Sequence, residues 1–126
     1  MNKTDVQAWL DRYIEAWRTH DRAQVEALFT EDAEYRYRPY GGDAHADQGR
    51  EAIVEGWLED DDPPDSWEAS YQPFAVDGNR AVATGFSRYF ASDKVPQRTF
   101  HNVFLLQFAD DGRCAGFTDY YMAEED

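Results

Sequence analysis

The sequence predicts a single α+β domain spanning residues 1–126, and two observations carry that prediction. Apolar residues recur at helical spacing in the first half of the chain, whereas apolar and polar residues alternate as in β-strands in the second half. Strong turn signals separate the predicted strands. Helices followed by a run of antiparallel strands are typical of an α+β domain, in which the helices cover the apolar face of the sheet.

Three helices are expected in the first half of the chain. Apolar and aromatic side chains recur every three or four residues from about Thr4 to Thr19, which predicts an amphipathic helix. Asp21 followed by Gln24 resembles a capping box at the start of a short second helix. The third helix is expected to begin near Gly49 and to bury Ile53, Trp57 and Leu58.

A strand and a glycine-containing loop separate the second and third helices. Residues 33–38 alternate in polarity, which places Tyr35 and Tyr37 on one side of a strand. Residues 39–49 contain three glycines and are interpreted as a loop that forms a lid over a pocket mouth. The acidic run at residues 59–65 is interpreted as a solvated helix end.

The second half of the chain is predicted to be all strand. Residues 67–76 and 80–90 read as two strands, and Pro73 places the first of them at a sheet edge or at a bulge. Residues 98–122 read as a long antiparallel hairpin, because an Asp-Gly pair separates two segments rich in β-branched and aromatic residues.

The register of this hairpin decides which side chains share a face. A two-residue turn at Asp111 and Gly112 makes Phe104 face Asp119 and turns His101 to the opposite side. A three-residue loop, or a bulge, shifts the register by one residue and brings His101 to the side of the carboxylate. Asp119 is the residue that needs an explanation, because an unpaired carboxylate among aromatic neighbours is costly to bury.

The composition and the net charge argue against some classes of binding partner. A formal net charge of −14 argues against nucleic acid and anionic membranes as partners, and an acidic, solvated surface is the simplest reading of it. Eight Tyr and four Trp suggest a core or a cavity lined by rings with polar edges. The sequence shows neither a signal peptide nor a run of about 18 apolar residues, which favours a soluble, cytoplasmic protein. The single cysteine, Cys114, is interpreted as a structural thiol.

Three segments resemble the nuclear transport factor 2-like superfamily and, within it, the SnoaL-like branch. They are RYIEAWRTHDRAQVEALFTEDAEYRY, GREAIVEGW and FADDGRCAGFTDYY. The resemblance implies a curved antiparallel β-sheet cone closed by three helices around an apolar pocket, commonly dimerised through the convex sheet. Members include ketosteroid isomerases, polyketide cyclases, scytalone dehydratase, limonene epoxide hydrolase and proteins that only bind a ligand or a partner.

The match to the isomerases is partial. Tyr13 falls where they keep a tyrosine that donates to the developing oxyanion, but Arg38 replaces their general base and Phe104 replaces their protonated aspartate. The connected carboxylate, arginine and carboxylate set of the epoxide hydrolases cannot be assembled. Asp119 falls where the SnoaL-like cyclases carry a pocket carboxylate that acts as acid and base.

The candidate catalytic residues are therefore Asp119, with Tyr13 as a hydrogen-bond donor and His101 as a helper. Burial should raise the pKa of Asp119, so that it could remove a proton next to a carbonyl or protonate an oxygen. Asp119 could instead be a buried brace tied to Arg88, Arg98 or a tyrosine, and His101 could be structural.

The candidate ligand-binding residues are aromatic. Core packing alone could justify the rings, but their hydroxyl and indole groups each need a partner when buried, which favours a ligand cavity. This set comprises Trp17, Tyr35, Tyr37, Trp57, Phe104, Phe117 and Tyr121.

No metal or organic cofactor is expected. Asp43, His45 and Asp47 alternate in the glycine loop but lack the rigid frame on which metal sites are usually built. Two functions remain open: a cofactor-independent cyclase, isomerase or hydratase-type lyase acting on a small apolar carbonyl compound, or a non-catalytic domain that binds a small ligand or dimerises. A homodimer is expected from the resemblance.

Overall fold

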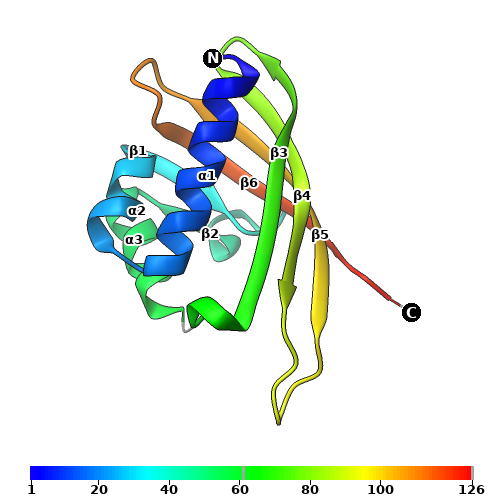
Figure 1. Cartoon of the computed structure of the whole chain (residues 1–126). Helices are drawn as coiled ribbons and strands as arrows, with labels where there is room; N and C mark the ends of the chain where they lie inside the picture. Colours follow the sequence, from blue (N-terminus) through cyan, green and yellow to red (C-terminus); the bar gives the residue numbers. More distant parts are fainter. Residues whose placement is uncertain (61, 126) are drawn as a thin grey trace.

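The computed structural model describes residues 1–60 and 62–125 (Figure 1). Its helices are α1 (Lys3–Thr19), α2 (Arg22–Leu28) and α3 (Arg50–Glu59), with short 3-10 turns η1 (Gly42–His45) and η2 (Pro64–Ser66). Its strands are β1 (Phe29–Arg36), β2 (Ala46–Gln48), β3 (Trp67–Asp77), β4 (Arg80–Tyr89), β5 (Arg98–Phe108) and β6 (Cys114–Ala123).

The strands form one curved, six-stranded sheet in the order β2-β1-β6-β5-β4-β3, and the helices lie against one of its faces (Figure 1). The predicted α+β class and the three helices are confirmed. Every neighbouring pair is antiparallel except β1 and β6, which are parallel, so the sheet is mixed. A tight turn can only join antiparallel strands. Because β1 and β6 are separated by most of the chain instead of by a turn, they can pair in parallel.

Local sequence signals explain where the helices begin. Asn2 and Asp5 form a reciprocal capping box at the start of α1. Asp21 caps α2 by accepting from the backbone N–H of Ala23. Gln24 does not complete a second capping box; its side chain accepts from the Thr19 hydroxyl, at 2.5 Å.

Two details of the predicted elements differ. β1 is longer than expected at its start, and the glycine loop contains η1 and the three-residue strand β2, which pairs with β1. On α3 the buried residues are Ile53 and Val54, with Trp57 half-buried, while Leu58 is 39% exposed. Leu58 lies about 100° further round the helix than Trp57, outside the stripe that faces the sheet.

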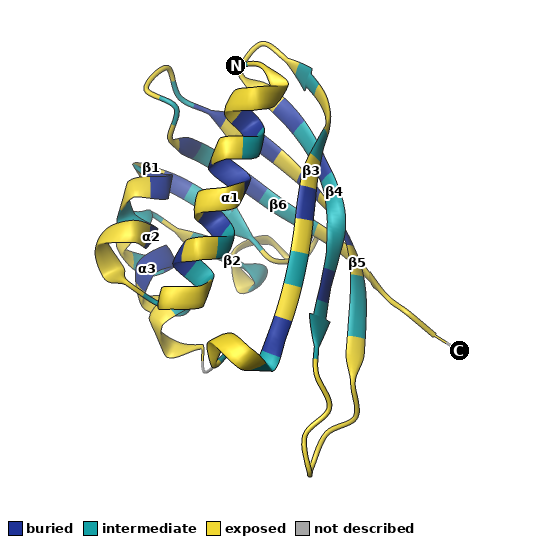
Figure 2. Ribbon diagram, viewed as in Figure 1, coloured by how far each residue is buried: buried dark blue, intermediate teal, exposed yellow. Residues whose placement is uncertain are grey.

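The core fills the space between the helices and the sheet, where buried and exposed residues alternate along the strands (Figure 2). Pro73 lies in edge strand β3, beside an irregularity in its pairing with β4, as expected of a proline in a sheet. Cys114 is fully buried, and burial raises the pKa of its thiol to about 12, which fits a structural role. None of the helices in the described part of the chain combines the length and apolar character needed to span a bilayer.

The β5–β6 hairpin has the predicted register but a different turn. Gly112 adopts a φ of 86° in a three-residue loop closed by a hydrogen bond from the Ala109 N–H to the Arg113 carbonyl, and the Gly112 N–H donates to the Ala109 carbonyl. This loop alone would shift the register by one residue. A pairing irregularity next to Gln107 leaves Ala115 unpaired and cancels the shift. Phe104 therefore faces Asp119.

Candidate functional site

A half-open cavity of about 480 Å³ lies between the sheet and helices α1 and α3. Its walls are aromatic, contributed by both helices and by four strands. The lining rings are Tyr13, Trp17, Tyr35, Tyr37, Trp57, Tyr71, Tyr89 and Phe104. Several of them contact one another, among them Tyr13 and Trp57, whose centroids lie 5.0 Å apart in an edge-to-face arrangement.

Two tyrosine hydroxyls form a pair in the wall. Those of Tyr13 on α1 and Tyr35 on β1 lie 2.8 Å apart within hydrogen-bond distance. Burial raises the pKa of both tyrosines, so both stay neutral. One hydroxyl donates to the other, and the second retains a proton that it can donate elsewhere.

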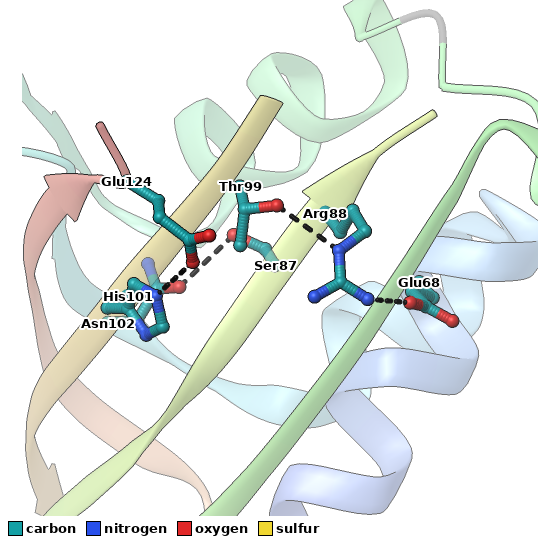
Figure 3. Close-up of polar contacts among 7 residues, drawn as sticks. All are labelled: Glu68, Ser87, Arg88, Thr99, His101, Asn102 and Glu124. Atoms are coloured by element: carbon teal, nitrogen blue, oxygen red, sulfur yellow. Dashed lines mark hydrogen bonds and ion pairs between the residues drawn. The ribbon is translucent and has the colours of Figure 1, made fainter. Parts of the chain in front are cut away.

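Asp119 on β6 supplies a carboxylate to the lining of this cavity. It accepts from the Asn102 amide, whose nitrogen lies 3.1 and 3.4 Å from its two oxygens. The Asn102 oxygen in turn accepts from the Ser87 hydroxyl at 3.1 Å (Figure 3). Because Asn102 and Ser87 are both buried, this chain fixes which way the amide points. Burial raises the pKa of Asp119 to about 6, against the lowering effect of the Asn102 bond.

In the described part of the chain, no guanidinium braces Asp119. Arg88 donates to Thr99 and pairs with Glu68 (Figure 3). Arg98 lies over the ring of Tyr89, 5.1 Å from its centroid. Among the described residues, the hydrogen bonds to the carboxylate come from Asn102. The alternative in which Arg88, Arg98 or a tyrosine braces Asp119 is therefore wrong for the described residues, and the group is an incompletely satisfied acid that lines the cavity.

Among the described residues, four more carboxylates line the cavity: Asp47, Glu59, Asp60 and Asp62. Asp62 accepts from the indole N–H of Trp17 at 3.1 Å, which ties the segment after α3 to α1. Burial and the charge of Asp62 raise the pKa of Asp60. Glu59 and Asp60 are exposed, as the interpretation of this acidic run as a solvated helix end expects, and Asp62 is half-buried; Asp61 lies outside the described residues. That interpretation did not include their place in the lining of the cavity.

Comparisons with known proteins identify the family. The sequence model described as a SnoaL-like domain matches residues 10–117. The chain belongs to the SnoaL-like domain family. The predicted resemblance is thus confirmed, and a comparison with curated proteins found no match.

Solved structures support the fold of this SnoaL-like domain. One is a structure of an M. tuberculosis LEH-like epoxide hydrolase, with a TM-score of 0.69 at 14% identity, covering 95% of this chain and 84% of that one. Another is a protein of unknown function with a cystatin-like fold from Methylobium petroleophilum PM1, with a TM-score of 0.68 at 15% identity, covering 100% and 81%. At these identities the likeness shows the fold alone.

Two aromatic residues predicted to line the cavity of the SnoaL-like domain do not. Phe117 is 1% exposed and lies behind Tyr35, with the two rings stacked at 4.3 Å. Tyr121 is 45% exposed, near the end of β6, and lies against Phe100. Both share the face of Asp119, but one is covered by another ring and the other is exposed near the end of its strand. The other five predicted rings line the cavity.

His101 does not belong to the cavity. It pairs with Met122 in the hairpin, faces away from Asp119, and its Nε2 lies 2.7 Å from a carboxylate oxygen of Glu124 (Figure 3). The register that would have placed it beside Asp119 does not occur, because the loop and the bulge cancel. His101 is thus removed from the candidate catalytic groups.

The glycine loop contributes one residue to the cavity. Asp47 of β2 lines it, whereas Asp43 and His45 belong to η1 and do not. Within residues 1–60 and 62–125, no group of three or more His, Cys, Asp or Glu side chains is arranged to hold a metal ion.

Sequence reasoning missed several polar groups of the site. Asn102 was detectable, because the predicted register already placed it on the face of Asp119. Ser87 lies on the helix-covered side of β4, where a small polar residue gave no distinct signal. Tyr71 and Tyr89 reach the cavity only because β3 and β4 curve around it, and curvature leaves no mark in the alternation of a strand.

Proposed function

We propose that this cavity binds a small molecule and that Asp119 serves there as a general acid and base, without a cofactor. The observation that supports this most is a cavity-facing carboxylate, oriented by one buried amide, whose pKa is raised to about 6. Such a group populates both protonation states close to neutral pH, where proton exchange is efficient. Perturbed carboxylates in clefts are candidate functional groups for that reason.

The chemistry that fits is proton transfer next to a carbonyl. The Asp119 carboxylate takes a proton from the α-carbon, the C–H electron pair becomes a C=C bond, and negative charge develops on the carbonyl oxygen. The Tyr13–Tyr35 pair offers one free O–H donor in the same cavity for that oxygen. Return of the proton from Asp119 to carbon completes an isomerisation or an exchange.

Hydration of an epoxide has less support. One structural neighbour is an LEH-like epoxide hydrolase, and the set expected for that chemistry includes an arginine between carboxylates. The described residues that line this cavity include no arginine.

The test is exchange of α-hydrogens for deuterium in D2O, followed by NMR on a panel of small aromatic ketones such as 2-tetralone. The native protein should accelerate exchange above buffer, and Asp119→Asn should lower the protein-dependent rate at least about 100-fold, the usual contribution of a general base. Asp77→Asn, an exposed carboxylate outside the cavity, is the matched control and should leave the rate unchanged. Exchange that survives in Asp119→Asn contradicts the proposal.

The alternative is a non-catalytic binding domain. Two departures from the isomerase pattern favour it: Arg38 donates to the Tyr40 hydroxyl, and Phe104 is 2% exposed and carries no acid. Ketones that bind equally to the native protein and to Asp119→Asn, with no exchange in either, would establish this alternative.

We also propose a homodimer through the sheet face opposite the helices. That face exposes large apolar side chains of β5 and β6, namely Val103, Leu105, Tyr120 and Met122. Contiguous exposed apolar patches commonly mark interaction sites. Light scattering should give twice the chain mass, and Val103→Lys with Met122→Lys should halve it; a monomeric native protein contradicts the proposal.

A further inference from the structure

We infer that the ligand of this cavity is a cation, a protonated amine carried on an aromatic or apolar body. The inference deepens the proposed function, and it rests on that proposal only in taking the cavity as the ligand site.

The first support is the charge of the lining. Asp119 and four other carboxylates line the cavity, and none of the lining residues in the described part of the chain is Lys, Arg or His. Nearby basic groups are outside the lining: Arg98 lies over the ring of Tyr89, and His20 is close enough to Asp60 to lower its pKa slightly. A cavity of one sign concentrates ions of the other sign.

The second support is that these carboxylates are poorly compensated. Burial and the charge of Glu59 raise the pKa of Asp47, and burial and Asp62 raise that of Asp60. The attraction of an entering cation offsets both the desolvation cost and the like-charge repulsion, whereas an anion would add repulsion. Among the described residues, Asp119 accepts from a single amide, although a carboxylate has about four lone-pair sites, so acceptors remain for ammonium N–H groups.

The third support is the aromatic wall. The faces of Tyr and Trp attract ammonium groups electrostatically, and the attraction strengthens when the cation is desolvated. The indole N–H of Trp17 is already donated to Asp62, which fixes the ring in the wall next to a carboxylate. Rings also provide apolar surface for the body of the ligand. Carboxylates and aromatic faces together match an organic ammonium ion better than a neutral or an anionic molecule.

The test compares three probes of similar size: 2-phenylethylamine (cation), 2-phenylethanol (neutral) and phenylacetate (anion). Binding is measured near neutral pH by calorimetry and by the fluorescence of the tryptophans. The amine should bind at least about 10-fold more tightly than the alcohol, phenylacetate should bind more weakly still, and added salt should weaken the amine selectively.

Two double variants test whether the cavity carboxylates cause the preference for the amine. Asp60→Asn with Asp62→Asn should remove most of the preference for the amine, while the amide oxygen introduced at position 62 can still accept from the Trp17 indole. Asp77→Asn with Asp93→Asn removes the same charge from exposed positions outside the cavity and should leave the preference intact. Circular dichroism of each variant verifies folding.

Equal affinity for amine and alcohol, failure of the amine to bind at millimolar concentration, or an equal loss in both double variants overturns the inference. These outcomes are separate from those of the exchange assay. Ketone exchange that depends on Asp119 without a preference for the amine contradicts the cation alone. A preference for the amine without exchange contradicts the catalytic proposal alone.

Discussion

Replacing Asp119 with Asn is expected to raise the free energy of unfolding near neutral pH by about 2–3 kcal/mol. The folded-state pKa of about 6 exceeds the value of about 3.9 in an unfolded chain, and each pKa unit corresponds to about 1.4 kcal/mol. Asn is neutral at every pH, and its oxygen can still accept from Asn102.

The sign of the pH dependence follows from the same shift. Because the folded state holds the Asp119 proton more tightly, the unfolded state binds fewer protons between about pH 4 and pH 6. The contribution of Asp119 to stability therefore falls as pH rises through that window and is constant above it. Asn at this position removes the dependence.

Urea unfolding at a series of pH values measures the effect as the difference between Asp119→Asn and the native protein. The difference is needed because the other acids among the 26 Asp and Glu residues also titrate. Asp77→Asn should show no such pH-dependent gap. A gap of zero, or one that does not grow between about pH 4 and 6, contradicts the raised pKa. A variant that is more stable but inactive would show a group retained for chemistry at a cost in stability.

Replacing Trp9 with Ala is expected to lower the free energy of unfolding by about 3–5 kcal/mol, the range for deleting a large buried aromatic ring. Trp9 is fully buried in α1, and its ring lies 5.6 Å from Phe108 and 6.0 Å from Phe29 in edge-to-face contacts. Its indole N–H also donates to the Leu28 carbonyl, at the end of α2. This carbonyl lacks a partner within its own helix.

Trp9→Phe separates the two contributions. It keeps most of the ring and removes the donor, so it should cost about 1–3 kcal/mol, the penalty for a buried carbonyl left without its partner. Denaturant unfolding followed by circular dichroism gives both values. A loss below about 1 kcal/mol for Trp9→Ala would contradict the described packing.

Much of the fold was predictable, because local signals carry it. The helical spacing of apolar residues located α1 and α3, and alternation with turn residues located the last four strands. β2 was missed because three residues are too few to show a period. The parallel pairing of β1 with β6 joins segments that are far apart in the chain, and local sequence patterns do not predict such a pairing.

The hairpin shows why a correct prediction can rest on an incorrect local structure. The expected two-residue turn is absent, yet Phe104 faces Asp119 because the longer loop and the bulge at Ala115 compensate. A bulge at an alanine has no sequence signature.

The sequence predicted which side chains of the candidate site lie on the same face of the sheet. It did not predict how deeply each side chain is buried or how the sheet curves around the cavity. Alternation placed Asp119 and Phe104 together, but it could not show that Phe117 lies behind another ring or that Tyr121 is exposed outside the cavity. Glu59, Asp60 and Asp62 were not assigned to the cavity, because an acidic run at a helix end is usually only solvated and the path of the chain from α3 to β3 is what brings this run to the cavity.

The buried thiol of Cys114 can report how often the structure around it opens. As the one cysteine in the chain, fully shielded and with a thiolate scarce below about pH 12, it is inaccessible to alkylating reagents while β6 stays in place. Alkylation of Cys114 therefore requires a local opening of the sheet. The rate of alkylation under native conditions measures how often β6 separates from β1.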